Sequence, residues 1–380
     1  MFYSRFLPGV GGGGARREAQ LIELLSPLGF DFHSVIGSPF TTSAWSRADH
    51  LYLWYLRRHA LETRCWDPLY AGYVTGLQAV ARRWAGELRH APKPRLALVD
   101  DPLFLSPLVR RLHRLAVPVV ALCQNLESLS AAQVKPTAQL RLLDRELGLL
   151  QRCALTVTIS REETVLLRNL GVAVHHLPFS PSAPDREALL AVRERRRESA
   201  QADFLMLGSA ANKVTADGMR RLIGFWESSP DLPAGERLLV AGYDTDTYLG
   251  GEDSARVIRL GALSGPALSD RLASVKALIC HQDQGAGALT RIPEAIIAGV
   301  PVAASRHAAR SHEGLPGLAT YATLRDLPRA LRDLTPGVPP LPAEDPRPGR
   351  DLLDMIARLL DGPFSATASE LCAKTIKGFE

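Results

Sequence analysis

The sequence contains few cysteines, and their spacing suits neither a metal site nor a disulfide framework. There are 5 cysteines in 380 residues, an odd number, and no Cys-x-x-Cys pair occurs among them. Structural zinc sites and disulfide staples are therefore not expected. Cysteines that lie in or beside apolar runs are commonly buried free thiols, so the sequence predicts a reducing, cytoplasmic environment.

Long hydrophobic runs and a strong excess of one charge are also missing. No stretch approaches the roughly 18 to 20 apolar residues of a membrane-spanning helix, and the first residues do not follow the pattern of a secretory signal. The formal net charge is only +5. Such a charge suits anionic small ligands or an acidic membrane surface and falls short of a nucleic-acid-binding protein. We expect no nucleic-acid partner, and peripheral membrane contact is left open.

Several catalytic motifs do not occur either. The sequence has no Gly-x-Ser-x-Gly elbow and no Walker-type phosphate loop, so acyl transfer and nucleotide hydrolysis lack support. Asp244 and Asp246 form an Asp-x-Asp pattern that could bind a metal, but they follow an apolar strand, where a polar turn is expected. His175 and His176 have no third ligand at metal spacing and are interpreted as structural. We expect no metal and no bound cofactor.

Short apolar segments alternate with helical patterns along nearly the whole chain. Continuous apolar strands interleaved with helices predict parallel sheets covered on both faces. Residues 32–94 are less regular and are interpreted as helices and loops lining one side of a cleft. The expected strands lie within residues 2–8, 30–37, 95–101, 117–125, 153–160, 204–210, 237–244, 256–263, 275–282, 300–305 and 318–324.

The length and a change of composition predict two domains. A chain of 380 residues exceeds what one core normally supports, and a charged, proline-preceded helix separates two apolar blocks. Its run Arg193–Arg197 is interpreted as a solvated linker face, with a nucleic-acid or lipid patch as the less favoured alternative. We assign residues 1–182 to an N-terminal Rossmann-like domain and residues 183–201 to a linker. Residues 202–345 are assigned to a C-terminal Rossmann-like domain, and residues 346–380 to a closing helix with its tail.

The most informative motif is a glycine-rich turn, QGAGALTRIPEA, that leads from an expected strand into a helix at residues 284–295. In open α/β sheets, ligands bind where the loops beyond the strands feed helix N-termini, which suit phosphate oxygens. Gly285 and Gly287 let the backbone approach a ligand closely. Thr290 and Arg291 offer hydrogen-bond donors to a diphosphate.

Glu294 near the start of that helix has two interpretations. A first-turn acid complements the helix dipole, which contributes less than about 1 kcal/mol. By composition alone this plain interpretation is favoured. A carboxylate at this position can also accept hydrogen bonds from two ribose hydroxyls, which would make it a ligand-binding residue.

The segment GAGALTRIPEAIIAGVPVAAS resembles the nucleotide-sugar loop of the GT-B-fold glycosyltransferases, in the large retaining group called family 4. The positions that match the family pattern, in order, are Gly285, Gly287, Thr290, Arg291, Glu294, Ala295, Gly299, Pro301 and Val302. Further segments agree in order along the chain, including LPGVGGGGARREAQ, VVALCQNLESL, CALTVTISREE and FLMLGSAANKV. The resemblance implies an α/β fold of two tandem doubly wound domains facing a cleft, with the acceptor bound by the first and the donor by the second.

The resemblance also implies roles for individual residues. Glu294 would hold the donor ribose, with Arg291 and Lys213 neutralising the diphosphate. The donor site would also include the loops around Asn212 and around the pair Gly12 and Gly13. The donor itself would be a sugar nucleotide such as a UDP-, GDP- or ADP-sugar, and the acceptor would be a glycan, lipid, protein or natural product.

Two positions depart from the family pattern. Many members carry a second glutamate where this chain has Ala286, although a glycine-rich subset lacks it. Relatives often place a histidine near the transferred sugar where this chain has Gln124, which can hydrogen-bond a sugar hydroxyl but cannot titrate. Asp100 or Asp101, at the end of the preceding strand, is a candidate contact for an acceptor hydroxyl.

The function predicted from the sequence is transfer of a sugar from a nucleotide-sugar, with retention and without a metal. Catalysis would be mainly electrostatic, through Arg291 and Lys213, with Gln124 near the sugar. One alternative is a non-catalytic protein of the same fold that binds a nucleotide-sugar or a partner, which Ala286 and Gln124 motivate. A second alternative is a nucleotide-sugar epimerase, which needs several cleft carboxylates and histidines that the sequence does not place.

Overall fold

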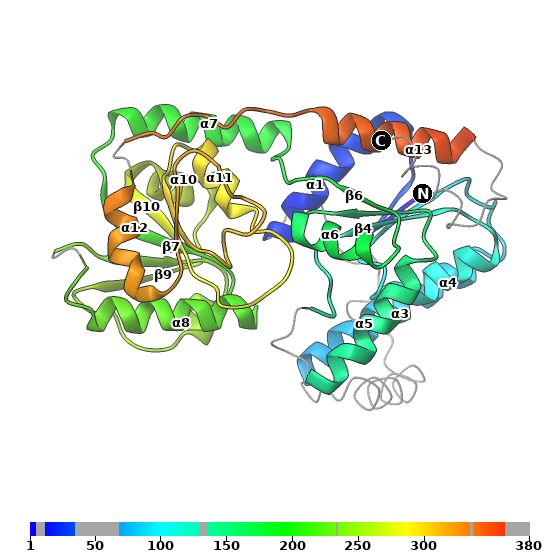
Figure 1. Cartoon of the computed structure of the whole chain (residues 1–380), viewed down its shortest axis with the longest axis horizontal. Helices are drawn as coiled ribbons and strands as arrows, with labels where there is room; N and C mark the ends of the chain where they lie inside the picture. The colour runs from blue at the N-terminus through cyan, green and yellow to red at the C-terminus, as the bar shows by residue number, and fades with distance from the viewer. Residues whose placement is uncertain are drawn as a thin grey trace. The chain divides into compact units, whose positions relative to one another are not determined.

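The computed structural model describes residues 1–4, 12–34, 68–129, 136–210, 212–232, 235–334 and 337–361. The chain forms two compact units (Figure 1). The first contains Met1–Val10, Leu21–Pro178 and Asp345–Glu380, and the second contains Gly11–Gln20 and Phe179–Glu344. Most of the irregular region expected at residues 32–94 lies outside the described residues.

The first unit is built on a six-stranded sheet in the order β2-β1-β3-β4-β5-β6. Every neighbouring pair of strands is parallel. The strands are β1 (Phe2–Ser4), β2 (Phe32–Ser34), β3 (Ala97–Asp100), β4 (Val119–Cys123), β5 (Leu155–Thr158) and β6 (Val174–His176). The helices are α1 (Gly13–Leu25), whose first residues belong to the second unit, η1 (Ser26–Leu28), α3 (Pro68–Glu87), α4 (Ser106–Arg114), α5 (Pro136–Leu150), α6 (Arg161–Asn169) and α13 (Arg347–Asp361).

Both faces of this sheet are covered by helices, as continuous apolar strands require. Along β4, Val119, Ala121 and Cys123 pack into one buried cluster together with residues of α3 and α4. The alternating residues Val120 and Leu122 pack into a second cluster on the other face, together with residues of α1 and α13. The C-terminal helix α13 is therefore part of the core of the first unit.

The second unit repeats this plan with a parallel sheet in the order β12-β11-β10-β7-β8-β9. Its strands are β7 (Ala202–Leu207), β8 (Leu238–Ala241), β9 (Val257–Gly261), β10 (Val275–Cys280), β11 (Val302–Ser305) and β12 (Leu318–Tyr321). Its helices are α7 (Ala183–Glu198), α8 (Lys213–Ser228), α9 (Thr245–Tyr248), α10 (Gly265–Ser274), α11 (Arg291–Ile297), η4 (Leu324–Asp326) and α12 (Leu327–Asp333).

Two buried clusters again lie on opposite faces of the sheet. One joins the sheet to α7, α10 and α11, and the other joins it to α8 and α12 (Figure 1). The prediction of an α/β protein with two doubly wound, Rossmann-like domains is confirmed. The sequence analysis did not predict β6, a short edge strand. In the described part of the chain, no helix is both long and apolar enough to cross a membrane.

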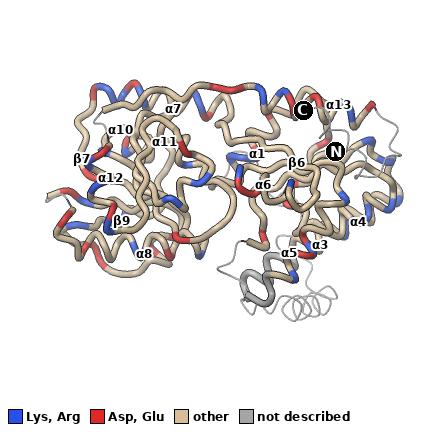
Figure 2. The backbone as a smooth tube through the Cα atoms, viewed as in Figure 1, with Lys and Arg blue, Asp and Glu red and all other residues tan. Residues whose placement is uncertain are grey.

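Helix α7, which contains the arginine-rich run, carries both basic and acidic residues (Figure 2). Two of its arginines are not solvated, because Arg193 is 6% and Arg196 0% exposed. Arg193 donates to the carbonyls of Ile296 and Ile297 at the end of α11, at 3.0 and 3.3 Å. Arg196 donates to the carbonyl of Leu272 near the end of α10, at 3.0 Å. The expectation of a solvated arginine run is wrong for these two residues, and their burial removes them from any surface patch.

Candidate functional site

The predicted donor-site residues gather where the parallel strands β7 and β10 of the second unit end. These two strands are neighbours in the sheet. The segment after β7 leads into α8, and the segment after β10 leads into α11. The carboxyl edge of a parallel sheet is where open α/β folds bind ligands. The described residues therefore bring two loop-to-helix junctions to one edge.

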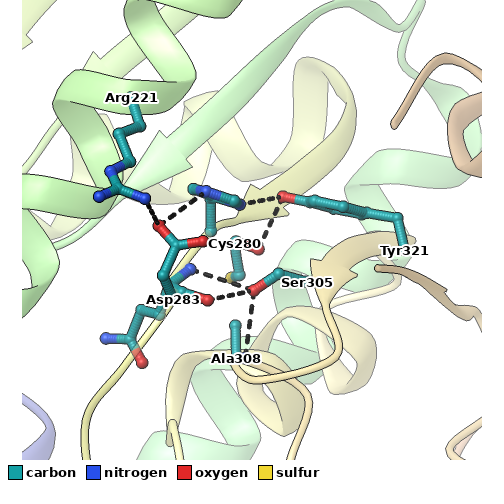
Figure 3. Close-up of polar contacts among 8 residues, drawn as sticks. Arg221, Cys280, Asp283, Ser305, Ala308 and Tyr321 are labelled. Atoms are coloured by element: carbon teal, nitrogen blue, oxygen red, sulfur yellow. Dashed lines mark hydrogen bonds and ion pairs between the residues drawn. The ribbon is translucent and has the colours of Figure 1, made fainter. Parts of the chain in front are cut away.

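The end of β10 is fixed to β11 by hydrogen bonds that involve Ser305 (Figure 3). Its hydroxyl accepts from the amide of Gln282 at 3.1 Å and donates to the Gln282 carbonyl at 2.7 Å. The same oxygen accepts from the amide of Ala308 at 3.2 Å. This arrangement gives the glycine-rich loop a rigid starting point, as a site with little reorganisation requires.

A second group of polar contacts surrounds His281 and includes Arg221, Asp283 and Tyr321, which are labelled in Figure 3. Its Nδ1 lies 3.1 Å from the hydroxyl of Tyr321, and its Nε2 lies 3.4 Å from the carboxylate of Asp283. Arg221 of α8 donates to the same carboxylate at 2.9 Å. Burial lowers the pKa of His281, although Asp283 acts in the opposite direction. These contacts connect β10, β12 and α8 beneath the loop, and sequence reasoning did not identify them.

The glycine-rich loop is held through its carbonyl groups. Arg310 donates to the carbonyls of Ala286 and Gly287, and His307 lies 3.3 Å from the carbonyl of Gly285. Gly285 and Gly287 have φ angles of 125° and 71°, in the region that favours glycine. The two glycines that the sequence analysis singled out therefore carry backbone conformations that a side chain would strain.

Arg291 points to the end of β7, where its guanidinium donates to the carbonyl of Leu207. A Cβ atom added to Gly208 would lie 2.3 Å from Nη1 of Arg291 and 2.7 Å from Cγ2 of Thr215. Gly208 thus lets the first turn of α8 and the side chain of Arg291 approach each other. Arg291 holds the loop together in this structure, so a role on a diphosphate stays a prediction.

The start of α8 has an ordinary capped geometry. The side chain of Asn212 accepts from the amide of Thr215 at 3.1 Å, as an N-cap does. Lys213 is the first residue of α8, with 55% of its side chain exposed, and pairs with Asp217 at 2.7 Å. The exposed ammonium is compatible with binding a mobile anion at this edge.

Glu294 is buried beside a cation that the sequence analysis did not consider. Its side chain is only 14% exposed, and its Oε1 lies 3.2 Å from Nε of Arg16 in α1. Burial raises the pKa of Glu294 to about 7, which Arg16 and Arg291 oppose and Asp185 reinforces. A dipole-capping acid at a helix start has no need to be buried, and buried carboxylates with a raised pKa are common at functional sites. The role of Glu294 on a ribose stays a prediction.

The first turn of α1 lies directly against the start of α11, within the second unit. A Cβ atom added to Gly13 would lie 2.7 Å from Oγ1 of Thr290, whereas one added to Gly12 would meet nothing within 4 Å. The two glycines therefore differ: Gly13 allows the contact between α1 and α11, and Gly12 borders open space. A role of either residue on phosphates remains a prediction.

Gln124 lies at the end of β4 in the first unit, beside the acids that end β3. Its backbone amide donates to Asp101 and its side-chain Nε2 donates to Asp100, both at 3.2 Å. Asp101 has a φ of 40°, a strained conformation for a residue other than glycine. The pair of aspartates that the sequence analysis associated with an acceptor therefore positions Gln124.

The loop after β4 is further held by two buried glutamates that sequence reasoning missed. Glu146 of α5 accepts from the amides of Glu127 and Ser128, both at 3.0 Å, and Glu163 of α6 accepts from the amide of Leu126 at 3.2 Å. A signal existed for Glu146, because it lies four residues from two leucines on the apolar stripe of its helix. Those leucines are Leu142 and Leu150.

Replacing Glu146 with glutamine should remove a pH dependence of stability. Burial raises the pKa of Glu146 from its ordinary value of about 4.5 to about 7, although hydrogen bonds from Ser128 and Glu127 act in the opposite direction. The folded state therefore binds the proton more tightly, and stability falls as pH rises from about 4.5 to 7. Over that window the wild type should lose on the order of 3 kcal/mol of unfolding free energy that the variant retains.

Thermal unfolding at pH 5 and pH 8 measures this difference. The exposed residue Asp144 on the same helix supplies the control, Asp144→Asn, which should follow the wild type at both pH values. An equal change of melting temperature with pH in Glu146→Gln and in the wild type would contradict the prediction.

The remaining polar motifs have structural surroundings. Asp244 has a φ of 60° and precedes the short helix α9, which confirms a polar turn. His175 and His176 lie 2.8 and 3.2 Å from the carbonyls of Pro348 and Ile159. Among the residues that the structure describes, no group of three or more His, Cys, Asp or Glu could hold a metal ion.

No protein-family model matches the sequence, and no curated protein matches it. Solved structures do match the fold. An α,α-trehalose-phosphate synthase (UDP-forming) from Burkholderia xenovorans is 11% identical, with a TM-score of 0.60, over 99% of this chain and 98% of its own. The corresponding enzyme from Burkholderia vietnamiensis is 13% identical, with a TM-score of 0.57, over 99% and 96%.

A sucrose-phosphate synthase from Thermosynechococcus elongatus is also similar, with 12% identity and a TM-score of 0.54 over 99% of this chain and 94% of its own. These structures are GT-B glycosyltransferases. The chain has their fold along nearly its whole length, so the GT-B architecture expected from the sequence is confirmed. The likeness does not distinguish family 4 from other groups with this fold.

Proposed function

We propose that this protein is a glycosyltransferase that takes its sugar from a ribonucleoside diphosphate sugar bound by the second unit. The observation that carries the proposal is the buried carboxylate of Glu294 behind a glycine-rich loop, at the carboxyl edge of a parallel sheet. Ionised carboxylates accept hydrogen bonds only, and the two hydroxyls of a ribose offer a matching pair of donors. The GT-B fold supports this interpretation only by analogy, because proteins with one fold can differ in function and the function depends on the residues of the site.

The chemistry proposed for this site is electrostatic. As the sugar leaves, negative charge builds up on the departing diphosphate, and preorganised cations stabilise that charge most strongly where water is excluded. Arg291 and Lys213 are the candidate cations, one held against the end of β7 and the other exposed at the start of α8. The diphosphate itself would accept the proton of the acceptor hydroxyl. The acceptor would be bound by the first unit, where Gln124 is the candidate hydrogen-bond partner for a sugar hydroxyl.

The donor nucleotide is the first property to test. One structure with this fold, from E. coli, contains bound UDP-2-fluoro glucose, and it matches this chain with a TM-score of 0.56 and 12% identity. UDP is therefore the first candidate for this chain, followed by GDP and ADP, and dTDP, whose sugar lacks the 2′-hydroxyl, is the nucleotide that should bind poorly. In a thermal-shift screen with these nucleotides and their sugars, nucleotides with one particular base should stabilise the protein. A nucleotide at a concentration 100 times its dissociation constant should raise the free energy of unfolding by about 2.7 kcal/mol. No shift with any nucleotide would reject the proposal.

A non-catalytic nucleotide-sugar-binding protein is the second candidate. It is favoured by Gln124, whose side-chain amide donates to Asp100 and cannot act as an acid or base. Release of nucleoside diphosphate from the identified donor, followed by NMR with and without a panel of sugar, sugar-phosphate and lipid acceptors, separates the two. Binding without release or transfer would favour the second candidate.

A further inference from the structure

Arg16 connects two carboxylates that come from different helices of the second unit. Its Nη1 lies 2.9 Å from Oδ1 of Asp185 in α7, and its Nε lies 3.2 Å from Oε1 of Glu294 in α11. The side chains of Arg16 and Asp185 are 34% and 30% exposed, whereas that of Glu294 is 14% exposed. The guanidinium therefore reaches from partly solvated surroundings to a buried anion.

The position of Arg16 is fixed from both sides. Gly13, one turn earlier, lies so close to Thr290 that a Cβ atom there would stand 2.7 Å from its hydroxyl oxygen. Asp185 is itself held by Ser182, whose hydroxyl donates to Oδ2 at 2.8 Å. The contact with Asp185 is a hydrogen bond, whereas the contact with Glu294 is an ion pair in which the buried Oε1 accepts no hydrogen bond among the described residues. The geometry thus aligns Arg16 with Glu294 before any ligand arrives.

The charges around Glu294 give Arg16 a specific effect. Burial disfavours the ionised carboxylate, and Asp185 adds to that effect. Two cations oppose it, Arg16 from α1 and Arg291 from its own helix. A protonated carboxyl group turns one of its acceptors into a donor and so matches a pair of ribose hydroxyls less well than the ionised group does.

We propose that Arg16 is the positioning residue for Glu294, keeping its carboxylate ionised and oriented toward the two hydroxyls of the donor ribose. This inference rests on the proposed function. Arg16 acts through Glu294 and need not contact the nucleotide. The role applies to UDP, GDP and ADP alike, because they share the ribose.

The variant Arg16→Gln tests the role by its pH dependence. Without the cation, the pKa of Glu294 should rise, and a rise of one unit reduces the ionised fraction below that pKa about tenfold. Calorimetric titration with UDP, GDP and ADP should therefore show binding about five- to tenfold weaker at pH 7, with the loss recovered toward pH 9. Arg16→Lys, which keeps the charge, should restore much of the affinity at pH 7. Arg329→Gln, at an arginine with an 82% exposed side chain, is the control.

A purely structural role would give a different result, in which binding weakens equally at all pH values and the melting temperature falls. That outcome, or unchanged affinity at pH 7, would overturn the inference. A titration of the 13C-labelled glutamate carboxyls, with Glu294 assigned from the variant Glu294→Gln, provides a readout without nucleotide. Its midpoint should rise in Arg16→Gln.

The two readouts separate this inference from the proposed function. If the wild type binds nucleotides and Glu294→Gln weakens them, while the carboxyl midpoint is the same in Arg16→Gln as in the wild type, only the role of Arg16 is rejected. If the wild type binds none of the three nucleotides, the proposed function and the ribose role of Arg16 are both rejected.

Discussion

Replacing Glu294 with alanine is expected to weaken binding of the donor nucleotide by about 10- to 150-fold for each ribose hydrogen bond that is lost. The estimate follows from hydrogen bonds to a charged group, which contribute about 1.5 to 3 kcal/mol each. The protein itself should stay folded, because the buried carboxylate is costly to ionise, as its raised pKa of about 7 indicates. Calorimetric titration gives the affinity, and thermal unfolding of the same samples gives the stability.

The ligand provides the sharpest control for this prediction. If Glu294 binds both ribose hydroxyls, the wild type should prefer UDP to 2′-deoxy-UDP, and Glu294→Ala should bind the two nearly equally. Glu313→Ala, at an exposed glutamate of the same unit, should keep the wild-type preference. A variant at Glu294 that still discriminates against the deoxynucleotide would place the ribose elsewhere.

The fold could be predicted because most strands of both sheets are buried on two faces. The segment VVALC of β4 has 5 buried residues in succession. Such a continuous apolar run is typical of a central parallel strand. The edge strand β6 has the sequence VHH, and all of its residues are half-buried. A short polar segment at a sheet edge carries no such signal, so its place depends on the pairing with β5.

The candidate site could be predicted in part. Glycine, Thr290, Arg291 and Glu294 stand close together in the sequence, so one loop and one helix start bring them to the same edge. The partner of Glu294 could not be found in this way. Arg16 lies in a different segment, and its approach depends on how the first turn of α1 packs against Thr290. The local sequence pattern therefore indicates Glu294, but its ionisation depends on a residue that only tertiary packing brings close.

The arginines of α7 also show that local sequence does not reveal tertiary packing, since residues predicted to be solvated are buried. Charge-rich helices are usually solvated, and Arg197 follows the rule with 57% of its side chain exposed. Arg196, its neighbour in the sequence, is fully buried. What distinguishes the two is the row of carbonyl groups that α10 and the start of β10 present to one face of α7, and no local pattern reveals that row.

Replacing Arg196 with methionine is therefore expected to destabilise the second unit by about 3 kcal/mol. Arg196 donates to the carbonyls of Leu272 and Lys276, each at 3.0 Å, and also to that of Val275. Each buried carbonyl that loses its donor costs about 1 to 3 kcal/mol. Relief of the buried charge offsets part of this cost, since burial lowers the pKa of Arg196 to about 10.

For a unit of this size, the loss corresponds to a melting temperature lower by about 6 to 12 °C. Arg197→Met is the matched control, because the exposed Arg197 donates to Glu194 on the same helix. A change at such a surface site should stay within about 0.5 kcal/mol. Amide hydrogen exchange localises the effect, since the residues around the junction of α10 and β10 should exchange faster in Arg196→Met alone. Equal stability of the two variants would mean that water replaces the guanidinium at the carbonyls, and that α7 is held to the sheet by its apolar contacts.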